Sequence, residues 1–167
     1  MDEPPNAAVW SGWQAALTPG EVLVTESGPG LFTQVMLDGA HTLTADEPMA
    51  SGGDNCGPSP YGLLLMSLGA CTSMTLRLYA DRKRWPLERV IVRLRHAKVH
   101  ERDAEHPDSA EAFLDRIDRS LTFVGPLDDE QRVRLLQIAD ECPVHRTLSG
   151  RTDIRTILME GIPRGGD

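Results

Sequence analysis

With 167 residues, of which 40% are apolar and 25% charged, the chain has the size and composition of one globular domain. Its net charge of −8 comes wholly from the first 76 residues, which hold eight carboxylates and no Lys or Arg, so nucleic acid is excluded as a partner. No leader sequence or membrane-length apolar run is visible, and three cysteines are too few for a secreted disulfide framework. These features predict a cytoplasmic protein without membrane contact.

The N-terminal third predicts an irregular arm followed by an antiparallel meander. Residues 1–19 lack a clear hydrophobic period, and we expect a loose arm there, before a single domain over residues 20–162. Strands are predicted over residues 21–25, 31–37 and 41–45. A Gly- and Pro-rich turn follows the first strand and an Asp-Gly turn follows the second, as in consecutive hairpins.

The best-defined element is a long helix. Ser59 and Pro60 supply a capping hydroxyl and a proline at the first helical position, and a Trp-Pro pair stops the helix near residue 84. About 24 residues give a length of about 36 Å. The first half is apolar nearly all round, so we expect it to be buried on most sides, whereas the half from Arg77 is polar and should reach solvent.

The second half of the chain predicts an α+β fold. Alternating apolar and basic residues predict a strand over residues 90–100 with one wet face, and a charged loop follows over residues 101–111. The remaining elements are a strand, an amphipathic helix, a short helix and a final strand, expected at residues 117–124, 128–141, from 142 onward and 152–159. This order lacks the βαβ alternation of a doubly wound parallel sheet.

Cys71 lies within the apolar half of the long helix. Leu64, Leu68, Thr75 and Leu78 share its stripe at helical spacing. Such surroundings raise the pKa of a thiol unless a cation or hydrogen-bond donors stabilise the thiolate, and the helix start is too far away to help. Position alone therefore favours a small buried side chain over a reactive thiol.

Cys142 has a different setting, because Pro143 follows it and His145 and Arg146 come shortly after. The proline predicts that Cys142 is the N-cap of a short helix, whose free N–H groups would stabilise a thiolate. The imidazole and the guanidinium can lie on the same helical face, while two preceding carboxylates oppose ionisation. An incidental cysteine at a helix terminus is an equally good interpretation.

Cys56 lies in a loop rich in Gly, Asp and Asn and is expected to be exposed. It could resolve a sulfenic acid, but a residue without a role is the simpler interpretation. Cys142 and His145 have the spacing of metal ligands, yet a structural zinc needs four ligands and the sequence has no second close pair, so we expect no metal. A phosphate loop, a nucleophile elbow and a dinucleotide fingerprint are also missing.

Three segments resemble the OsmC family of osmotically inducible and organic hydroperoxide resistance proteins. They are the Gly- and Pro-rich entry to the long helix with Cys71 (residues 46–72), the end of that helix with its Trp-Pro-Leu (residues 74–87), and the motif Cys-Pro-Val-His-Arg-Thr-Leu (residues 142–148). The resemblance covers residues 20–160 and includes both cysteines in the expected settings.

The resemblance implies an α+β fold with antiparallel sheets and a long buried central helix, in an intertwined homodimer. It also implies a thiol-dependent hydroperoxide reductase of oxidative stress defence. In that enzyme Cys71 would attack an organic or lipid hydroperoxide, and the resulting sulfenic acid would form a disulfide with Cys142. No cofactor is implied; an external reductant, either a dithiol such as a lipoylated protein or a small thiol, would reduce the disulfide.

The sequence departs from the family pattern at two activating residues. Characterised reductases of the family use an N-terminal Arg to stabilise the thiolate and a Glu near the start of the long helix to orient it. Here no Arg precedes Arg77, and the helix begins with Tyr61 and Gly62 where a carboxylate would stand. The candidate substitutes are Arg146 and His145 for the cation and Glu47 and Asp54 for the carboxylate.

Two further functions fit the same residues. A member that has lost efficient catalysis could bind an apolar ligand or sense oxidants through the dimer pocket, and in a third interpretation the thiols serve only in packing. Without a nearby cation, a buried Cys71 would be protonated at neutral pH and react slowly. A disulfide between Cys71 and Cys142 after treatment with an organic hydroperoxide would separate the first function from the others.

Overall fold

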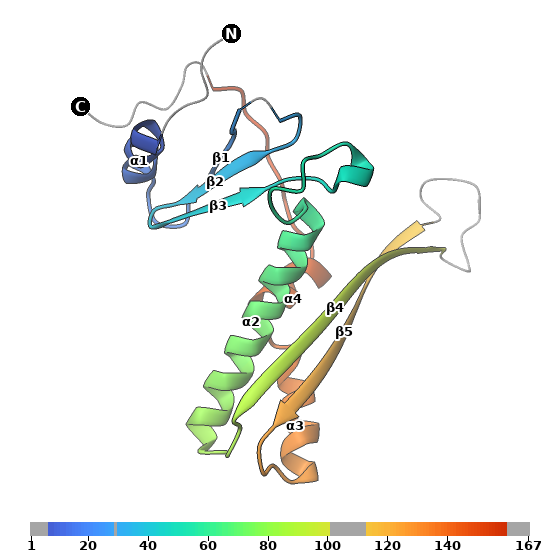
Figure 1. The fold of residues 1–167 in the computed structure, drawn as a ribbon. Helices are drawn as coiled ribbons and strands as arrows, with labels where there is room; N and C mark the ends of the chain where they lie inside the picture. Colours follow the sequence, from blue (N-terminus) through green and yellow to red (C-terminus); the bar gives the residue numbers. More distant parts are fainter. Residues whose placement is uncertain (1–6, 29, 101–112, 160–167) are drawn as a thin grey trace. The chain divides into compact units, whose positions relative to one another are not determined.

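The computed structural model describes residues 7–28, 30–100 and 113–159 (Figure 1). The chain divides into two compact units, the N-terminal unit, Met1–Leu63 with Arg155–Asp167, and the central unit, Leu64–Ile154. Both units contain an antiparallel sheet and share one long helix, which confirms the predicted α+β class. The limits of an arm over residues 1–19 and a domain over residues 20–162 stay a prediction.

In the N-terminal unit, helix α1 (Ala7–Ala16) precedes a three-stranded antiparallel sheet. The strands are β1 (Leu23–Glu26), β2 (Gln34–Asp38) and β3 (His41–Ala45), in the order β1-β2-β3, so the predicted meander is confirmed. The helix stands where a loose arm was expected. Its Ala-rich sequence has a high helix propensity, which outweighs the missing apolar period.

The two faces of this sheet differ in burial. Val35 and Leu37 point from β2 to the buried face. On the other face Val24 and Leu43 flank Met36 across the strands, and both are exposed. Because successive residues of a strand point to opposite faces, the meander leaves an apolar face uncovered in the single chain.

Asp46 organises the loop between β3 and the long helix. Its buried carboxylate accepts the backbone N–H of Glu47 at 2.8 Å on one oxygen and those of Asp54 and Cys56 at 3.1 Å on the other. The N–H of Cys56 is the main cause that keeps the pKa of Asp46 below its ordinary value, although burial opposes ionisation. One ionised side chain therefore holds several turns of the loop together.

Helix α2 (Pro60–Lys83) begins and ends as the sequence predicts. The Ser59 hydroxyl accepts the N–H of Gly62 at 3.2 Å, which is an N-terminal capping bond. At the other end Arg84 takes a left-handed conformation with φ of 55°, and the N–H of Trp85 reaches back to the carbonyl of Ala80. These are the features of a Schellman terminus, which stops the helix before the proline.

Among the described residues, α2 buries one face. Leu68, Thr72, Leu76 and Ala80 lie four residues apart and form the buried stripe. The opposite face leaves three large apolar side chains in solvent: Met66, Met74 and Leu78. The expected burial on most sides is therefore wrong for the single chain. By length and composition α2 could also cross a membrane, a criterion that core helices of other proteins meet as well.

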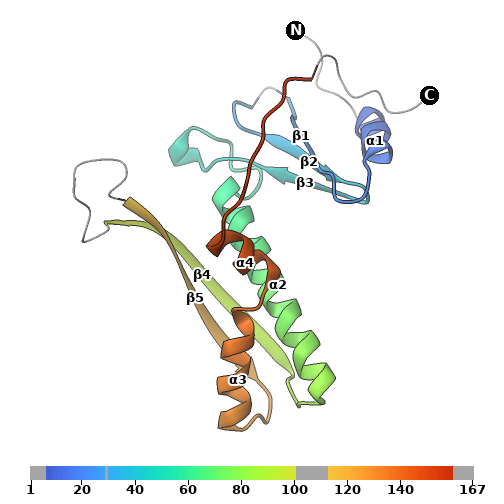
Figure 2. The ribbon, with the colours of Figure 1, turned by 180° about the vertical axis from the view of Figure 1, so that it is seen from behind.

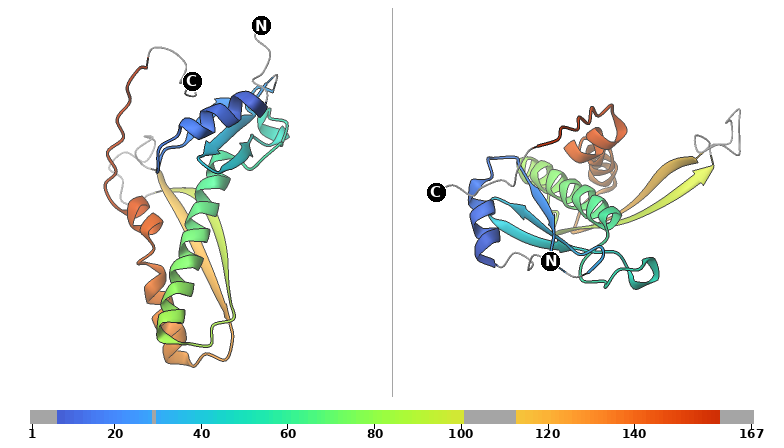
Figure 3. Two further views of the ribbon diagram at one scale, coloured as in Figure 1. Left: turned by 90° about the vertical axis from the view of Figure 1, so that its left-hand side faces the viewer. Right: turned by 90° about the horizontal axis from the view of Figure 1, so that it is seen from above.

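The central unit places two long strands and two helices beside α2 (Figures 2 and 3). Strands β4 (Arg89–His100) and β5 (Phe113–Val124) form an antiparallel hairpin, and α3 (Asp129–Ala139) and α4 (Pro143–Ser149) follow. All four were predicted, although β5 begins four residues earlier than expected. The charged loop predicted over residues 101–111 lies outside the described residues.

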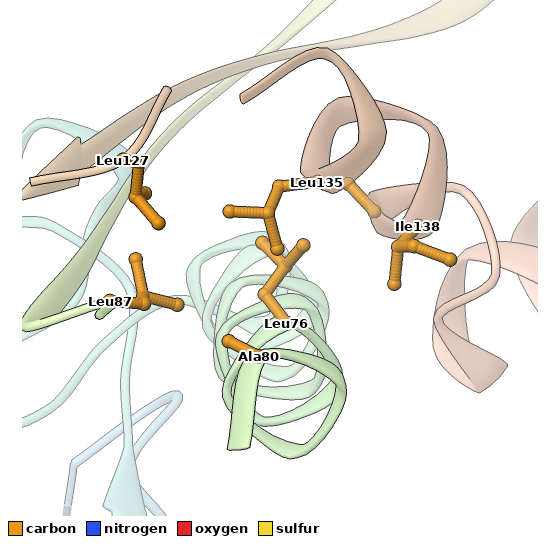
Figure 4. Close-up of a cluster of buried hydrophobic side chains, with 7 residues drawn as sticks. Leu76, Ala80, Leu87, Leu127, Leu135 and Ile138 are labelled. Atoms are coloured by element: carbon orange, nitrogen blue, oxygen red, sulfur yellow. The ribbon is translucent and has the colours of Figure 1, made fainter. Parts of the chain in front are cut away.

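The core of the central unit joins α2 to α3 and to the turns at the end of the hairpin (Figure 4). Leu76 of α2 and Leu135 of α3 point toward each other and are fully buried, with Leu87 and Leu127 beside them. In the first half of α2, Leu94 of β4 packs against the backbone of Gly69. A Cβ at this glycine would lie 3.0 Å from the leucine side chain. These contacts fix α2 against both the hairpin and α3.

Residues 151–159 have no regular secondary structure, so the strand predicted over residues 152–159 is wrong for the single chain. The segment exposes four large apolar side chains: Ile154, Ile157, Leu158 and Met159. An apolar sequence with high β propensity becomes a strand only where a neighbouring strand offers hydrogen bonds. The pattern is therefore that of a strand, but no strand among the described residues pairs with it.

Candidate active site

The structure brings Cys71 and Cys142 together in the central unit. Cys71 lies in the middle of α2 and is partly exposed, whereas Cys142 directly precedes α4 and has no exposed surface. Both are free thiols, and their side chains are joined by a hydrogen bond. Two thiols in contact can lose two electrons and form a disulfide, which neither thiol can do alone.

The start of α4 directs backbone donors at the pair. Cys142 is the N-cap residue, and Pro143 occupies the first helical position, as predicted. The N–H groups of Val144 and His145 then point at the Cys142 sulfur, and that of Val144 also reaches Cys71. Free N–H groups at a helix start are the donors that stabilise a thiolate.

The two thiols differ in acidity. Burial opposes ionisation of Cys142, but hydrogen bonds from Cys71, the His145 N–H, the Thr72 hydroxyl and the Val144 N–H together lower its pKa. Burial raises the pKa of Cys71, and the hydrogen bond with Cys142 raises it further. The pKa of Cys142 therefore lies below the ordinary value of a thiol, and that of Cys71 lies above it.

Arg119 of β5 is linked to the thiol pair through the Thr72 hydroxyl. Its guanidinium donates to the Thr72 hydroxyl at 3.1 Å, to the Ala139 carbonyl at 3.0 Å and to the Asp140 carboxylate at 2.7 Å. The Arg119 side chain is 13% exposed and that of Asp140 66%. A largely buried guanidinium thus stands one hydroxyl away from the Cys142 sulfur.

Sequence reasoning missed Arg119, although a signal exists. Ile117, Leu121 and Phe123 alternate with exposed residues along β5, and Arg119 occupies the same inward face. A charged residue in the apolar register of a strand needs partners inside the protein. That register could have marked the arginine before the structure was known.

The predicted cations His145 and Arg146 take different positions. The His145 ring lies 3.6 Å from the Asp140 carboxylate, and its backbone N–H, not its ring, reaches Cys142. Arg146 is exposed and lines an open groove with Arg151 and Asp153. Of the two, only His145 is joined to the thiol pair, and it contributes a main-chain donor.

The predicted carboxylates Glu47 and Asp54 belong to the N-terminal unit. Their backbone N–H groups both bond to the Asp46 carboxylate, which brings them together in one loop. Cys56 also lies in this loop and is exposed, as predicted. An activating role for either carboxylate stays a prediction.

A cavity of about 240 Å³ lies in the central unit. Arg119, which bonds the Thr72 hydroxyl, and His145, whose N–H bonds Cys142, form part of its wall. The remaining wall consists of Leu68, Asp115, Ile117, Leu148 and Ser149. Among the described residues, no group of three or more His, Cys, Asp or Glu could hold a metal ion.

The fold and the site define an α+β protein with two free thiols in contact, one on a long helix and one at the start of a short helix. The sequence model of a family described as OsmC-like protein matches residues 52–157, well over half of the chain, and includes both thiols. The chain therefore belongs to the OsmC-like family, as the resemblance predicted. No curated protein matches the sequence.

Solved structures of this family share the fold. The OsmC like protein from Mycoplasma pneumoniae has a TM-score of 0.60 and 18% identity, over 78% of this chain and 86% of that chain. The organic hydroperoxide resistance protein OsmC from Legionella pneumophila has a TM-score of 0.57 and 18% identity, over 80% and 93%. The organic hydroperoxide resistance protein OhrB of Bacillus subtilis has a TM-score of 0.55 and 19% identity, over 80% and 93%.

Proposed function

We propose that this protein is a thiol-dependent peroxidase that reduces organic hydroperoxides, lipid hydroperoxides among them, in oxidative stress defence. The supporting observation is the hydrogen bond between Cys71 and Cys142, which come from elements far apart in the sequence. The family and the organic hydroperoxide resistance proteins of the same fold support a role related to peroxides.

Exposure supports different roles for the two thiols. Cys71 is partly exposed, whereas Cys142 is fully buried, so a peroxide molecule meets Cys71 first. Cys71 is then the attacking thiol, and Cys142 needs to reach only its neighbour. The nearby cavity has apolar walls at Leu68, Ile117 and Leu148, which suit an organic substituent on the peroxide better than hydrogen peroxide.

The reaction has two steps. The Cys71 sulfur attacks the distal oxygen of the hydroperoxide, the O–O bond breaks, and the alcohol leaves after taking up a proton. Cys71 is now a sulfenic acid. The Cys142 sulfur attacks the Cys71 sulfur, the S–O bond breaks, and the oxygen leaves as water. Two thiols have been oxidised to a disulfide and one hydroperoxide has been reduced to an alcohol.

An external thiol completes the cycle. Cys71 is the more exposed of the two cysteine residues, so an incoming thiolate would attack its sulfur in the disulfide and release Cys142. A dithiol, such as the lipoyl group of a lipoylated protein, removes the mixed disulfide within one encounter, and a small thiol needs two. The protein itself requires no cofactor in this scheme.

The same proposal includes a homodimer. Met66, Met74 and Leu78 are exposed on one face of α2, and residues 151–159 have an apolar strand sequence that pairs with no strand in the described part of the chain. Large exposed apolar surfaces of this kind mark protein interfaces. A second copy of the chain would cover the helix face and could pair with the strand sequence.

The surroundings in the cell are also part of the proposal. A cytoplasmic location suits free thiols, because cytosolic reductants keep cysteines reduced. The acidic first 76 residues disfavour nucleic acid as a partner. A homodimer would cover the apolar face of α2, so this helix would not need a membrane to bury it.

Mass spectrometry of the oxidised protein tests the peroxidase function. The reduced protein is mixed with an equal amount of cumene hydroperoxide, and its peptides are mapped without reduction. We expect a disulfide between Cys71 and Cys142 in the wild type and in the Cys56→Ser control. Peroxide consumption that survives in full in Cys71→Ser would overturn the assignment.

A weaker enzyme that binds an apolar ligand or senses oxidants is the second candidate. The observation in its favour is the raised pKa of Cys71, which leaves the attacking thiol protonated at neutral pH, with burial as the main cause. Free thiols that persist for minutes with stoichiometric hydroperoxide would favour this candidate over the peroxidase.

A further inference from the structure

We propose that Arg119 is a positioning residue that, through the Thr72 hydroxyl, directs a hydrogen bond onto the Cys142 sulfur and keeps Cys142 ionised as the proton acceptor for Cys71. The proposal rests on the peroxidase function for its chemical meaning. Arg119 would supply from β5 the positive charge that other members of the family take from an N-terminal arginine.

The guanidinium of Arg119 is held in one orientation. One nitrogen donates to both the Thr72 hydroxyl at 3.1 Å and the Ala139 carbonyl at 3.0 Å, and the other donates to Asp140 at 2.7 Å. Thr72 has no exposed surface, and neither has Ala139. A side chain fixed at three points on two elements cannot turn away from the hydroxyl that it contacts.

This arrangement sets the direction of the Thr72 hydrogen bond. A guanidinium has donors only, so the hydroxyl oxygen accepts from Arg119. The single hydrogen of the hydroxyl is then left to donate, and the Cys142 sulfur is the hydrogen-bonded partner. A donor hydrogen bond favours the thiolate over the thiol, and a donor polarised by a cation favours it further.

Four titratable or charged groups are joined to Cys142 by the described contacts. They are Cys71 of α2, Arg119 of β5, Asp140 at the end of α3, and His145 of α4. Asp140 is the only anion among these four, and its carboxylate is largely in solvent, where water screens its charge. Arg119 is mostly buried, so its charge is screened less than that of Asp140.

The thiolate gives the first step a base. As the Cys71 sulfur bonds to the distal peroxide oxygen, its proton passes along the existing hydrogen bond to the Cys142 sulfur. The O–O bond breaks, and the leaving alkoxide takes that proton to become the alcohol. Cys142 is a thiolate again and attacks the sulfenic acid; the S–S bond forms, the S–O bond breaks, and the released hydroxide takes a proton from a buffer acid and leaves as water.

The test measures the titration of Cys142 alone. Cys56→Ser with Cys71→Ser leaves one thiol and keeps a hydroxyl donor at position 71. Thiolate ultraviolet absorbance is followed against pH in this background and after addition of Thr72→Val, Thr72→Ser, Arg119→Met or Arg116→Met. Arg116→Met removes an exposed charge from the same strand and is the matched control.

We expect Thr72→Val and Arg119→Met each to raise the midpoint by about one pH unit. Thr72→Ser and Arg116→Met should leave it in place. Because Arg119 acts through Thr72, adding Arg119→Met to Thr72→Val should shift the midpoint little further. Arg119 also binds the end of α3, so Arg119→Met could unfold the protein, and Thr72→Val then decides the question.

An unchanged midpoint in Thr72→Val would overturn the proposal, and so would fully additive shifts in the double variant. The titration needs no peroxide, so its outcome is separate from that of the peroxidase assay. If the disulfide forms but Thr72→Val leaves the midpoint unchanged, the proposed role of Arg119 is refuted and the peroxidase function stands. If the midpoints shift as expected but no disulfide forms, the role of Arg119 stands and the peroxidase function is refuted.

Discussion

After burial, the hydrogen bond between Cys71 and Cys142 is the largest influence on both thiols, and it raises the pKa of the more exposed Cys71 while it lowers that of the buried Cys142. Burial alone would give the opposite order, because a buried thiol is harder to ionise. This order is reversed because hydrogen bonds from Cys71, from the start of α4 and from the Thr72 hydroxyl lower the pKa of Cys142. The acidity of each thiol therefore depends on the presence of the other.

This dependence predicts the effect of removing Cys142. Burial is the largest cause of the raised pKa of Cys71, and the hydrogen bond with Cys142 is the next. Cys142→Ser, in a Cys56→Ser background, removes the negative neighbour and leaves the burial unchanged. The pKa of Cys71 should fall, which thiolate absorbance against pH would detect. If the pKa of Cys71 in the Cys142→Ser variant were equal to or higher than in the protein that retains Cys142, the described pairing of the two thiols would be wrong.

Asp46→Asn should destabilise the N-terminal unit in a pH-dependent way. The folded-state pKa of Asp46 lies below the unfolded value of about 3.9, chiefly because the Cys56 N–H bonds the carboxylate. Stability from this carboxylate is complete above that value and is lost as pH falls through the folded pKa. The melting temperature of the variant should be lower at pH 7, and the gap to the wild type should narrow in acid.

Asp54→Asn is the matched control for that experiment. Asp54 lies in the same loop, and its backbone N–H, which the substitution leaves in place, is the group that bonds Asp46. Its melting temperature should follow the wild type across the pH range. An equal gap at every pH for Asp46→Asn would show that the ionised carboxylate is not what holds the loop.

The core of the central unit offers a paired test on neighbouring leucines. Leu135 of α3 is fully buried against Leu76, whereas Leu136 is 51% exposed. Leu135→Ala should lower the free energy of unfolding by about 2–5 kcal/mol, because it removes buried contacts and leaves a cavity. Leu136→Ala should cost well under half as much in urea titrations. Equal losses would contradict the assigned orientation of α3.

The proposed homodimer predicts a change of size on substitution of Met74. This side chain is 70% exposed at the centre of the uncovered face of α2. Met74→Glu would place a charge in the interface and should yield a monomer in light-scattering measurements, while Met74→Leu keeps an apolar side chain of similar volume and should stay dimeric. A dimeric Met74→Glu protein would place the interface elsewhere.

Local signals predicted the elements whose ends are determined locally. The limits of α2 follow from the Ser59 cap and the Trp-Pro stop, and the start of α4 follows from Pro143. The strand predicted over residues 152–159 failed because a strand depends on a neighbour that the local sequence does not name. Helix α1 was missed because its propensity has no accompanying apolar period.

The candidate site was predictable only in part. Both cysteines were singled out by their settings, but their contact depends on how α4 returns to α2, and only the family resemblance suggested it. Arg119 was missed because its partners, Thr72 and Asp140, come from two other elements. When the partners of a charged residue come from distant segments, its only local signal is a charge in the apolar register of its strand, as at Arg119 in β5.

The distance in sequence between the two cysteines gives the redox state a second, physical meaning. A disulfide between Cys71 and Cys142 would close a loop of about 70 residues that spans the hairpin and α3, and in the chain-entropy account such a crosslink stabilises the folded state by about 4 kcal/mol. The oxidised protein should therefore melt well above the reduced one. The turnover intermediate would then be the more heat-resistant form, and a melting curve would report how much of the protein has met peroxide.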